Sequence, residues 1–380
     1  MSTAKIAVLK RLPTNTKKMK IHLTPETIKL VLSGLSKAVQ RRATLPVLSY
    51  VLIQRKKSLV ALTVTDLDAW ITLAAGEDIA PDASALVPLV AFKAIPKNSA
   101  ATVNIGDKST SLTYMVGETE ITVPVDFMPA DDFPATPTFA GPVPCPLGDA
   151  KSHILQAMQC ASKDAMRYVL QGCYLDVSKA NSHVVVATDG TQLFSANSVT
   201  LPFDKSVILP DHAFVTCPAF VKDGPWSMST DKDECIVLAS DNFTFQCSAI
   251  DANFPNWRQV IPDSGAAKTR ITFTPDTAAA ILRMLPGIPE SKKDINHGIG
   301  LRVTKQGVEL LGRTSESGFD STFPVTAAVK GLEQTIALNR ELLKRALSFG
   351  LLDLEVFDPL SALRFHAPSR QMVVMPMRVA

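Results

Sequence analysis

The stretch His183-Val-Val-Val-Ala-Thr-Asp-Gly-Thr-Gln-Leu-Phe194 predicts a β-hairpin. Its β-branched run favours a strand that ends at Thr188-Asp189. Gly190 supplies the backbone freedom that a tight turn needs, and Leu193 and Phe194 then begin a second strand.

The hairpin pattern returns twice, at intervals of about 125 residues, which indicates an internal repeat. The other copies run from Leu59 to Thr72 and from Val308 to Ser321. A predicted helix precedes each copy. Thr24-Pro25 and Thr274-Pro275 each place a capping residue before a proline at the first helical position, and Gly148-Asp149 occupies the corresponding place in the middle copy.

A second, shorter helix is expected in each repeat, at residues 87–97, at residues 210–222 and after the cap Asn339. The Pro-rich run 135–146 and the polar run 262–268 separate the repeats. We therefore expect an α+β fold of three repeated domains, each with two helices on β-sheets. The expected limits are a basic N-terminal extension at residues 1–18 and domains at residues 19–139, 140–265 and 266–380.

The composition of the 380 residues is that of an ordinary globular protein, with 39 Lys and Arg against 36 Asp and Glu and a net charge of +3. A polyanionic partner would therefore have to meet a localised basic face. No apolar run approaches the roughly 18 to 20 residues that span a bilayer, and no secretory signal is present, so we expect a cytoplasmic protein without membrane contact. The six cysteines form no CxxC pair and no zinc-ligand spacing. We expect no metal and no cofactor.

An enzyme is the first alternative, because Asp66, Asp68, Asp189 and His183 could form a carboxylate and histidine site for metal-assisted hydrolysis. However, Asp66 and Asp189 occupy the same turn in different repeats, so aspartates that cap turns are the better interpretation. The chain also contains no GxxxxGK[ST] loop and no GxSxG elbow. We expect no catalytic activity.

Five motifs, in three predicted domains, resemble the bacterial DNA polymerase III beta subunit family, the sliding clamps. They are Arg42-Ala-Thr-Leu-Pro-Val-Leu48, Leu62-Thr-Val-Thr-Asp-Leu-Asp68, Ala187-Thr-Asp-Gly-Thr-Gln-Leu193, Phe254-Pro-Asn-Trp-Arg-Gln-Val-Ile-Pro262 and Val373-Val-Met-Pro-Met-Arg378. The resemblance implies a head-to-tail homodimer whose six domains close into a ring around duplex DNA. Such a ring tethers the replicative DNA polymerase, is placed by a clamp loader and catalyses nothing.

Basic residues off the apolar stripes of the predicted helices agree with this resemblance, because contacts to backbone phosphates bind any sequence and permit sliding. An ordinary solvated helix face is the alternative interpretation. Arg340 belongs to this predicted basic face. Asp164 falls where the family has a glutamine, and an acid there would repel phosphate. The expected DNA-binding residues are Lys37, Arg41, Arg42, Lys93, Arg167, Tyr168, Arg283, Lys344 and Arg345.

The resemblance also implies a groove between the second and third domains. In the family it receives peptides, typically glutamine followed by leucines and a phenylalanine, from polymerases, the loader and other clamp-motif proteins. Thr191-Gln192 stands where the family commonly has a basic pair. The expected walls of this site are Leu170, Thr188, Gly190, Thr191, Leu193, Pro255, Val260, Leu360, Ala362, Val373, Val374, Met375, Pro376, Met377 and Arg378.

The departures at Asp164 and at Thr191-Gln192 support a second alternative. In it, the chain is a clamp paralogue that acts mainly as a peptide-binding scaffold or confers tolerance to an inhibitor.

Overall fold

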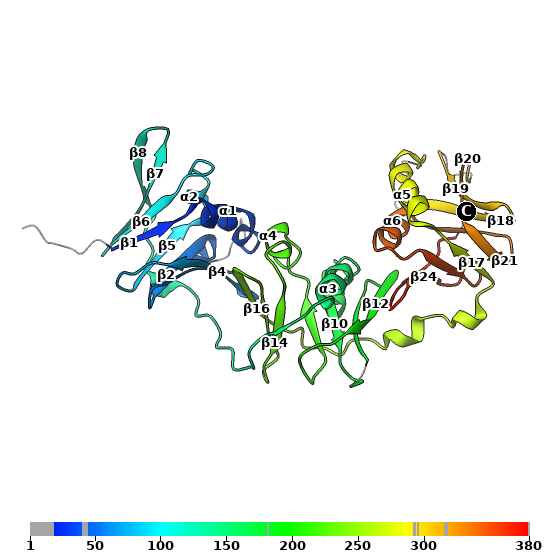
Figure 1. Cartoon of the computed structure of the whole chain (residues 1–380), viewed down its shortest axis with the longest axis horizontal. Coiled ribbons are helices and arrows are strands. Elements are labelled where there is room, and N and C mark those ends of the chain that lie inside the picture. Colours follow the sequence, from blue (N-terminus) through cyan, green and yellow to red (C-terminus); the bar gives the residue numbers. More distant parts are fainter. Residues whose placement is uncertain are drawn as a thin grey trace, which may run out of the picture. The chain divides into compact units, whose positions relative to one another are not determined.

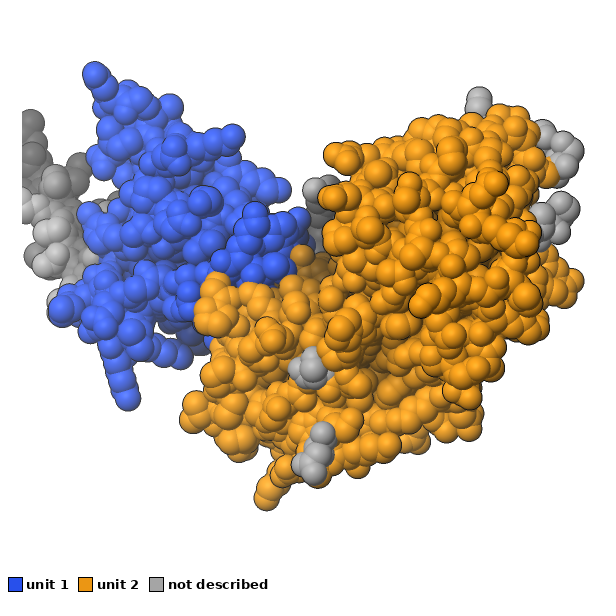
Figure 2. Space-filling model, turned by 45° about the vertical axis from the view of Figure 1, so that its right-hand side comes forward, with its two compact units in different colours: residues 1–138, 217–223, 240–246 blue, residues 139–216, 224–239, 247–380 orange. Residues whose placement is uncertain are grey.

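The computed structural model describes residues 19–39, 45–180, 182–291, 294, 296–314 and 318–378. The expected N-terminal extension, Arg41 and Arg42 lie outside these residues. The chain divides into two compact units, drawn in different colours in Figure 2. Unit 1 comprises residues 1–138, 217–223 and 240–246, and unit 2 comprises residues 139–216, 224–239 and 247–380.

Unit 1 contains two antiparallel sheets and short helices, labelled in Figure 1. One sheet has the order β1-β6-β7-β8, and the other has the order β5-β2-β3-β4 with β16 beside β4. The helices are α1 (Pro25–Ser33), α2 (Leu89–Phe92) and α4 (Pro218–Val221). The strands are β1 (Met19–Leu23), β2 (Tyr50–Lys56), β3 (Leu59–Thr65), β4 (Ala69–Glu77), β5 (Ala83–Pro88), β6 (Ala101–Gly106), β7 (Ser109–Val116), β8 (Thr119–Val125) and, through residue 246, β16 (Phe243–Ser248).

Unit 2 contains a nine-stranded sheet of order β13-β10-β11-β12-β25-β24-β23-β17-β21, a four-stranded sheet of order β20-β19-β18-β22, and the strands β15-β14-β9. Its helices are α3 (Ala150–Met158), α5 (Pro275–Met284) and α6 (Arg340–Ser348). Its strands are β9 (Cys145–Pro146), β10 (Gly172–Asp176), β11 (His183–Thr188), β12 (Gln192–Val199), β13 (Val207–Pro210), β14 (Ser227–Thr230), β15 (Cys235–Ala239), β17 (Thr269–Thr272), β18 (Gly298–Thr304), β19 (Gly307–Gly312), β20 (Ser321–Val325), β21 (Ala328–Gly331), β22 (Gln334–Asn339), β23 (Asp353–Val356), β24 (Leu363–Ala367) and β25 (Arg370–Val374).

The predicted caps start three of the helices. The Thr24 hydroxyl accepts a hydrogen bond from the Thr27 amide at 3.1 Å, and the Thr274 hydroxyl accepts from the Thr277 amide at the same distance. The Asn339 side chain accepts from the Glu341 amide at 2.7 Å and starts α6. Each bond satisfies a donor that the first helical turn leaves without a partner inside the helix. Figure 1 shows α5 and α6 side by side in unit 2.

The predicted hairpin is confirmed at the level of single hydrogen bonds in two of its three copies. In the third copy β19 and β20 pair, but β19 ends at Gly312 and β20 begins only at Ser321, so the tight turn predicted around residues 313–314 is wrong. The Asp189 carboxylate accepts from the amides of Thr191 and Gln192, and Asp66 accepts from the amides of Asp68 and Ala69. The two aspartates are therefore turn caps in separate units, and no chemistry needs to be assigned to them. Across the described ranges, no group of three His, Cys, Asp or Glu side chains could hold a metal ion.

The second helices are shorter than predicted in the first two repeats. Instead of residues 87–97, α2 covers Leu89–Phe92, because β5 continues through Pro88. Instead of residues 210–222, α4 covers Pro218–Val221. A helix starting at Asp211 would place Pro218 in its interior, where proline lacks the amide hydrogen that a helix requires.

The element order nevertheless repeats along the chain. A strand and a longer helix recur at β1–α1, β9–α3 and β17–α5, and a further helix recurs at α2, α4 and α6. The limits of the three domains stay a prediction. Among the described residues, no helix has the length and apolar character needed to cross a membrane.

Candidate functional site

An apolar cluster joins the middle and last parts of unit 2. Its buried members lie on β11, β12, β25 and the 3-10 turn η5 (Trp257–Val260). Because β12 and β25 pair antiparallel with Leu193 opposite Val373, the strands hold these two side chains on one face of the sheet. The cluster consists of Val184, Val186, Leu193, Trp257 and Val373, with Tyr174, Phe254, Ile261 and Ala362 packed against it.

Exposed apolar side chains lie close in the sequence to members of this cluster or to residues packed against it. Val260 is 53% exposed, Leu360 63% and Met375 49%. Each is two or three residues from a cluster member, namely Trp257, Ala362 or Val373. A buried apolar floor with exposed apolar side chains around it is typical of a surface that binds an apolar partner, and methionine adapts to partners of different shape. We name the five buried residues of the cluster the apolar floor, and Val260, Leu360 and Met375 the apolar rim.

The other predicted peptide-site residues fall into different surroundings. Val374 is fully buried and points to the opposite face of β25 from Val373. Met377 donates from its amide to the Ala337 carbonyl at 2.7 Å, and Met377 and Arg378 border a small pocket beside β18 and β22. Leu170 and Pro376 are half-buried, whereas Pro255 is exposed. The structure thus brings Leu193, Ala362 and Val373 together, but it places Met377 and Arg378 beside a different sheet.

The turn from Thr188 to Gln192 is rigid because its own side chains bond within it. The Thr191 hydroxyl and the Gln192 side-chain amide both donate to the Asp189 carboxylate, each at 2.7 Å. Gly190 has a φ of +90°, a conformation that glycine tolerates best. Met375 donates from its amide to the Thr191 carbonyl at 2.9 Å, which ties the turn to the apolar rim.

Two of the predicted DNA-binding arginines contact this turn. Arg345 on α6 donates from Nη1 to the Gln192 side-chain oxygen at 2.7 Å. Arg167 donates from Nη1 to the Asp189 carbonyl at 2.9 Å, and its Nε lies 3.6 Å from the Asp164 carboxylate. Gln192 is only 4% exposed, so its side chain is engaged inside the protein. Gln192 therefore connects the turn with α6, and Asp164 pairs with the neighbouring Arg167.

We predict that Gln192→Ala destabilises unit 2 by about 1 to 3 kcal/mol, because two half-buried charged groups, the Arg345 guanidinium and the Asp189 carboxylate, lose a hydrogen-bond partner. Chemical denaturation measures this loss. The matched control is Thr191→Ala, which removes an exposed side chain from the same turn. An equal loss in both variants would contradict the role assigned to the bond between Gln192 and Arg345.

Trp257 is anchored by a buried carboxylate. Its indole Nε1 donates to Asp176 at 3.2 Å, and Arg258 pairs with the same carboxylate oxygen at 2.8 Å. Burial by itself raises the pKa of Asp176, but hydrogen bonds from Ser178 and the charge of Arg258 hold it below its ordinary value. The carboxylate therefore stays charged and fixes Trp257 as part of the apolar floor.

The other predicted DNA-binding side chains are available to solvent. Lys37 and Lys93 in unit 1, and Arg283 and Lys344 in unit 2, are exposed. Tyr168 is 55% exposed. Lys344 pairs with Glu341 at 3.3 Å, but both side chains are half exposed, and such a surface pair is weak. The residues of α5 and α6 that do not face the core thus offer cations to a polyanion.

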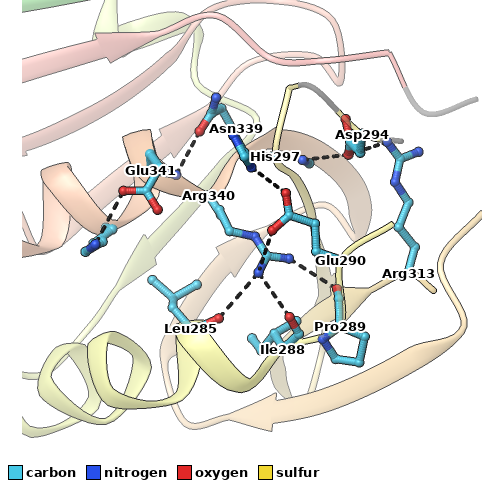
Figure 3. Close-up of polar contacts among 12 residues, drawn as sticks. Leu285, Ile288, Pro289, Glu290, Asp294, His297, Arg313, Asn339, Arg340 and Glu341 are labelled. Atoms are coloured by element: carbon cyan, nitrogen blue, oxygen red, sulfur yellow. Dashed lines mark hydrogen bonds and ion pairs between the residues drawn. The ribbon is translucent and has the colours of Figure 1, made fainter. Parts of the chain in front are cut away.

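Arg340 is a correction to the predicted basic face. It is only 7% exposed, and Figure 3 shows its guanidinium directed inward at the base of α6. It donates to the Ile288 carbonyl at 3.0 Å and the Pro289 carbonyl at 3.1 Å, and it lies 3.4 Å from the Glu290 carboxylate. Its place in the sequence, directly after the cap Asn339, made it look like an outward residue of the first turn. The carbonyls that it satisfies lie about fifty residues earlier in the chain, where local periodicity carries no information.

The sequence also failed to indicate Asp176 and Trp257 as parts of the site. A signal existed for Trp257, because Phe254 and Trp257 place two large aromatic rings three residues apart shortly before the polar run 262–268. Asp176 carried no such signal.

No model of a known protein family matches the chain. The beta sliding clamp of Pseudomonas putida KT2440 is 28% identical over 240 residues, which are 60% of this chain and 64% of the relative. The matched region is thus less than two thirds of that relative. The beta sliding clamp of C. crescentus superposes with a TM-score of 0.81 at 19% identity, over 95% of this chain and 99% of that one.

The chain has the beta sliding clamp fold. A clamp from Pseudomonas aeruginosa, the DNA polymerase III subunit beta bound to griselimycin, gives a TM-score of 0.77 at 21% identity, over 95% of this chain and all of that one. The resemblance to the DNA polymerase III beta subunit is therefore confirmed. The α+β clamp fold accounts for the recurrence of the strand and helix pattern along the chain.

Proposed function

We propose that this chain is a DNA sliding clamp, a homodimeric ring that encircles duplex DNA without sequence specificity and tethers the replicative DNA polymerase. In this role it is not an enzyme and needs no cofactor. Its partners are double-stranded DNA, the polymerase, the clamp loader and other proteins with the clamp motif. It acts in the cytoplasm, where bacterial DNA is replicated.

One observation carries the proposal: the likeness to the C. crescentus clamp extends over 95% of this chain and 99% of that one. The match therefore includes α6, which carries the exposed Lys344, and the segments after α1 and α2, which carry the exposed Lys37 and Lys93. The proposed DNA-binding surface and the proposed peptide-binding surface lie on different elements of the fold. The cations lie on or beside helices, and the apolar rim borders the sheet.

Retention on circular DNA tests the proposal. The full-length chain is loaded onto nicked circular DNA with the loader of its source organism, and gel filtration measures the amount that stays with the DNA. A topological ring is retained on the circle and is lost when a restriction enzyme linearises it. Equal retention on circular and linear DNA would contradict encirclement.

We predict that the triple variant Lys37→Glu, Lys93→Glu and Lys344→Glu is retained on DNA less than the wild type and with a weaker salt dependence. Each lysine that contacts a phosphate contributes about one unit to the slope of log affinity against log salt. A salt series on circular DNA gives the slope. The matched control exchanges Lys56, Lys108 and Lys330 for glutamate, which changes the net charge equally on strands or their turns. A triple variant that behaves like this control would contradict the DNA-facing role of the helices.

A peptide-binding scaffold is the second candidate. The contacts of Arg167 with Asp164 and of Arg345 with Gln192 favour it. These two cations already have partners within the chain, so they are less available to bind DNA phosphates. In this case an apolar partner peptide binds to the chain, but the chain is not retained on circular DNA.

A further inference from the structure

A polar pocket lies beside the apolar cluster on the nine-stranded sheet. It encloses about 230 Å³ and is bordered by the cationic residues Lys179, Arg258, Arg364 and Arg370, of which Arg370 donates to the Phe349 carbonyl at 3.0 Å. Ser195 and Gln371 form part of its wall. Among the described residues that line it there is no aspartate and no glutamate. The pocket therefore presents cations and neutral donors to a ligand.

Two buried carboxylates near the pocket do not cancel its charge. Asp176 pairs with Arg258, whereas Glu355 lies 3.0 Å from Arg364 and 3.4 Å from Arg270. Glu355 thus shares one negative charge between two arginines. The ammonium of Lys179, which is exposed, pairs with no side chain that the structure describes. Four cationic residues border the pocket and only two carboxylates lie behind it, so an excess of positive charge remains.

The wall of the pocket is held in place by a chain of hydrogen bonds. Arg364 donates from Nε to the Gln371 side-chain oxygen at 2.7 Å, and Gln371 donates from Nε2 to the Ser195 hydroxyl at 3.1 Å. Arg258 lies over the ring of Trp257, with 4.3 Å between its Cζ and the ring centroid. Because these contacts fix the donors before a ligand arrives, binding requires little further ordering.

The strand register places this pocket directly beside the apolar floor. Leu193 pairs with Val373 in the floor, and Ser195 pairs with Gln371 two residues away along the same two strands. Because alternate residues of a strand share a face, these two pairs lie on the same face of the sheet. The distance between them is about 7 Å, the length of two residues of an extended peptide. Arg364 is the cross-strand neighbour of Val373 on β24. A peptide on the floor would therefore bring its flanking residues to the pocket.

We propose that this pocket binds an acidic side chain, an aspartate or a glutamate, two or three residues outside the apolar motif of the partner peptide. The inference rests on the proposed peptide-binding function and adds a determinant of specificity to it. The apolar residues of the peptide supply contact area, whereas the acidic residue selects among peptides that share the apolar motif.

Fluorescence anisotropy with labelled peptides tests this inference on the full-length chain. All probes contain glutamine, two leucines and a phenylalanine. One probe has alanines on both sides, a second has two aspartates on the N-terminal side, and a third has two aspartates on the C-terminal side. We expect one aspartate probe to bind about fivefold more tightly than the alanine probe at low salt, with a smaller advantage as salt rises.

Variants locate the effect in the pocket. Lys179→Glu should abolish the advantage of the aspartate probe and leave the affinity for the alanine probe unchanged. Lys330→Glu on β21 changes the net charge equally and should preserve the advantage.

Equal affinities for all three probes on the wild type, or equal effects of the two variants, would overturn the inference while the peptide site itself stands. If no probe binds, the proposed peptide function fails as well. Competition by inorganic phosphate that lowers only the aspartate advantage would support binding of the carboxylate in this pocket.

Discussion

Arg340→Ala is expected to lower the free energy of unfolding by about 3 to 5 kcal/mol, because it removes a buried guanidinium that bonds backbone carbonyls and faces a half-buried carboxylate. The guanidinium satisfies the carbonyls of Ile288 and Pro289 and faces the Glu290 carboxylate (Figure 3). His297 also contacts Glu290, but its charge depends on protonation, so it cannot replace a permanent cation. Without Arg340, the carbonyls lose their donor at a position where water has little access.

Urea denaturation followed by circular dichroism measures this loss. Lys344→Ala is the matched control on the same helix, because it removes an exposed cation whose pair with Glu341 lies at the surface. The control should unfold like the wild type, yet it should be retained less well on DNA. If Arg340→Ala unfolded at the wild-type urea concentration, the guanidinium would have no structural role, and Arg340 would return to the set of candidate DNA contacts.

Val260→Asp is expected to weaken binding of an apolar partner peptide by about 30-fold, because it replaces an apolar contact of the interface with a charge. Val260 belongs to the apolar rim, and it follows Trp257 in η5, which forms part of the apolar floor. A carboxylate at this position would lose water on peptide binding and would gain no cationic partner from an apolar motif. The stability of the protein should change little, because half of the valine is already exposed.

Isothermal titration with the alanine-flanked peptide gives the affinity. Val143→Asp provides the control, since Val143 is 84% exposed in the linker before β9 and belongs to no part of the proposed site. Unchanged affinity in Val260→Asp would remove the apolar rim from the peptide site. A loss in both variants would point to an effect of net charge.

The local features of this fold follow from short stretches of sequence. Thr24, Thr274 and Asn339 each precede a helix and cap it, because capping depends on residues that are close in the chain. The turns at Asp66 and Asp189 follow for the same reason. Leu67 has a φ of +79°, at the position that Gly190 occupies in the other turn. The turn chemistry of the surrounding residues thus holds even a leucine in a conformation that it normally avoids.

The contacts that shape the candidate site connect distant parts of the chain. The bond from Arg345 to Gln192 and the burial of Arg340 depend on where α6 lies in three dimensions, and neither residue is unusual in its local pattern. The acidic Asp164 looks unsuitable for a DNA-facing position when read in the sequence. In the structure it pairs with Arg167, so the acid at this position has a cationic partner within the chain.

The place of β25 in the nine-stranded sheet has a consequence for the order of folding. It lies between β12 and β24, and the bond from Gln371 to Ser195 closes a loop of 176 residues. During synthesis, β12 emerges long before the strand that covers its edge. That edge therefore stays unpaired while the ribosome makes the intervening chain, and an unpaired edge can associate with other chains. The pairing of β12 with β25, which carries part of the apolar floor, would be among the last contacts of unit 2 to form. Nascent chains would therefore bind partner peptides only after β25 is in place.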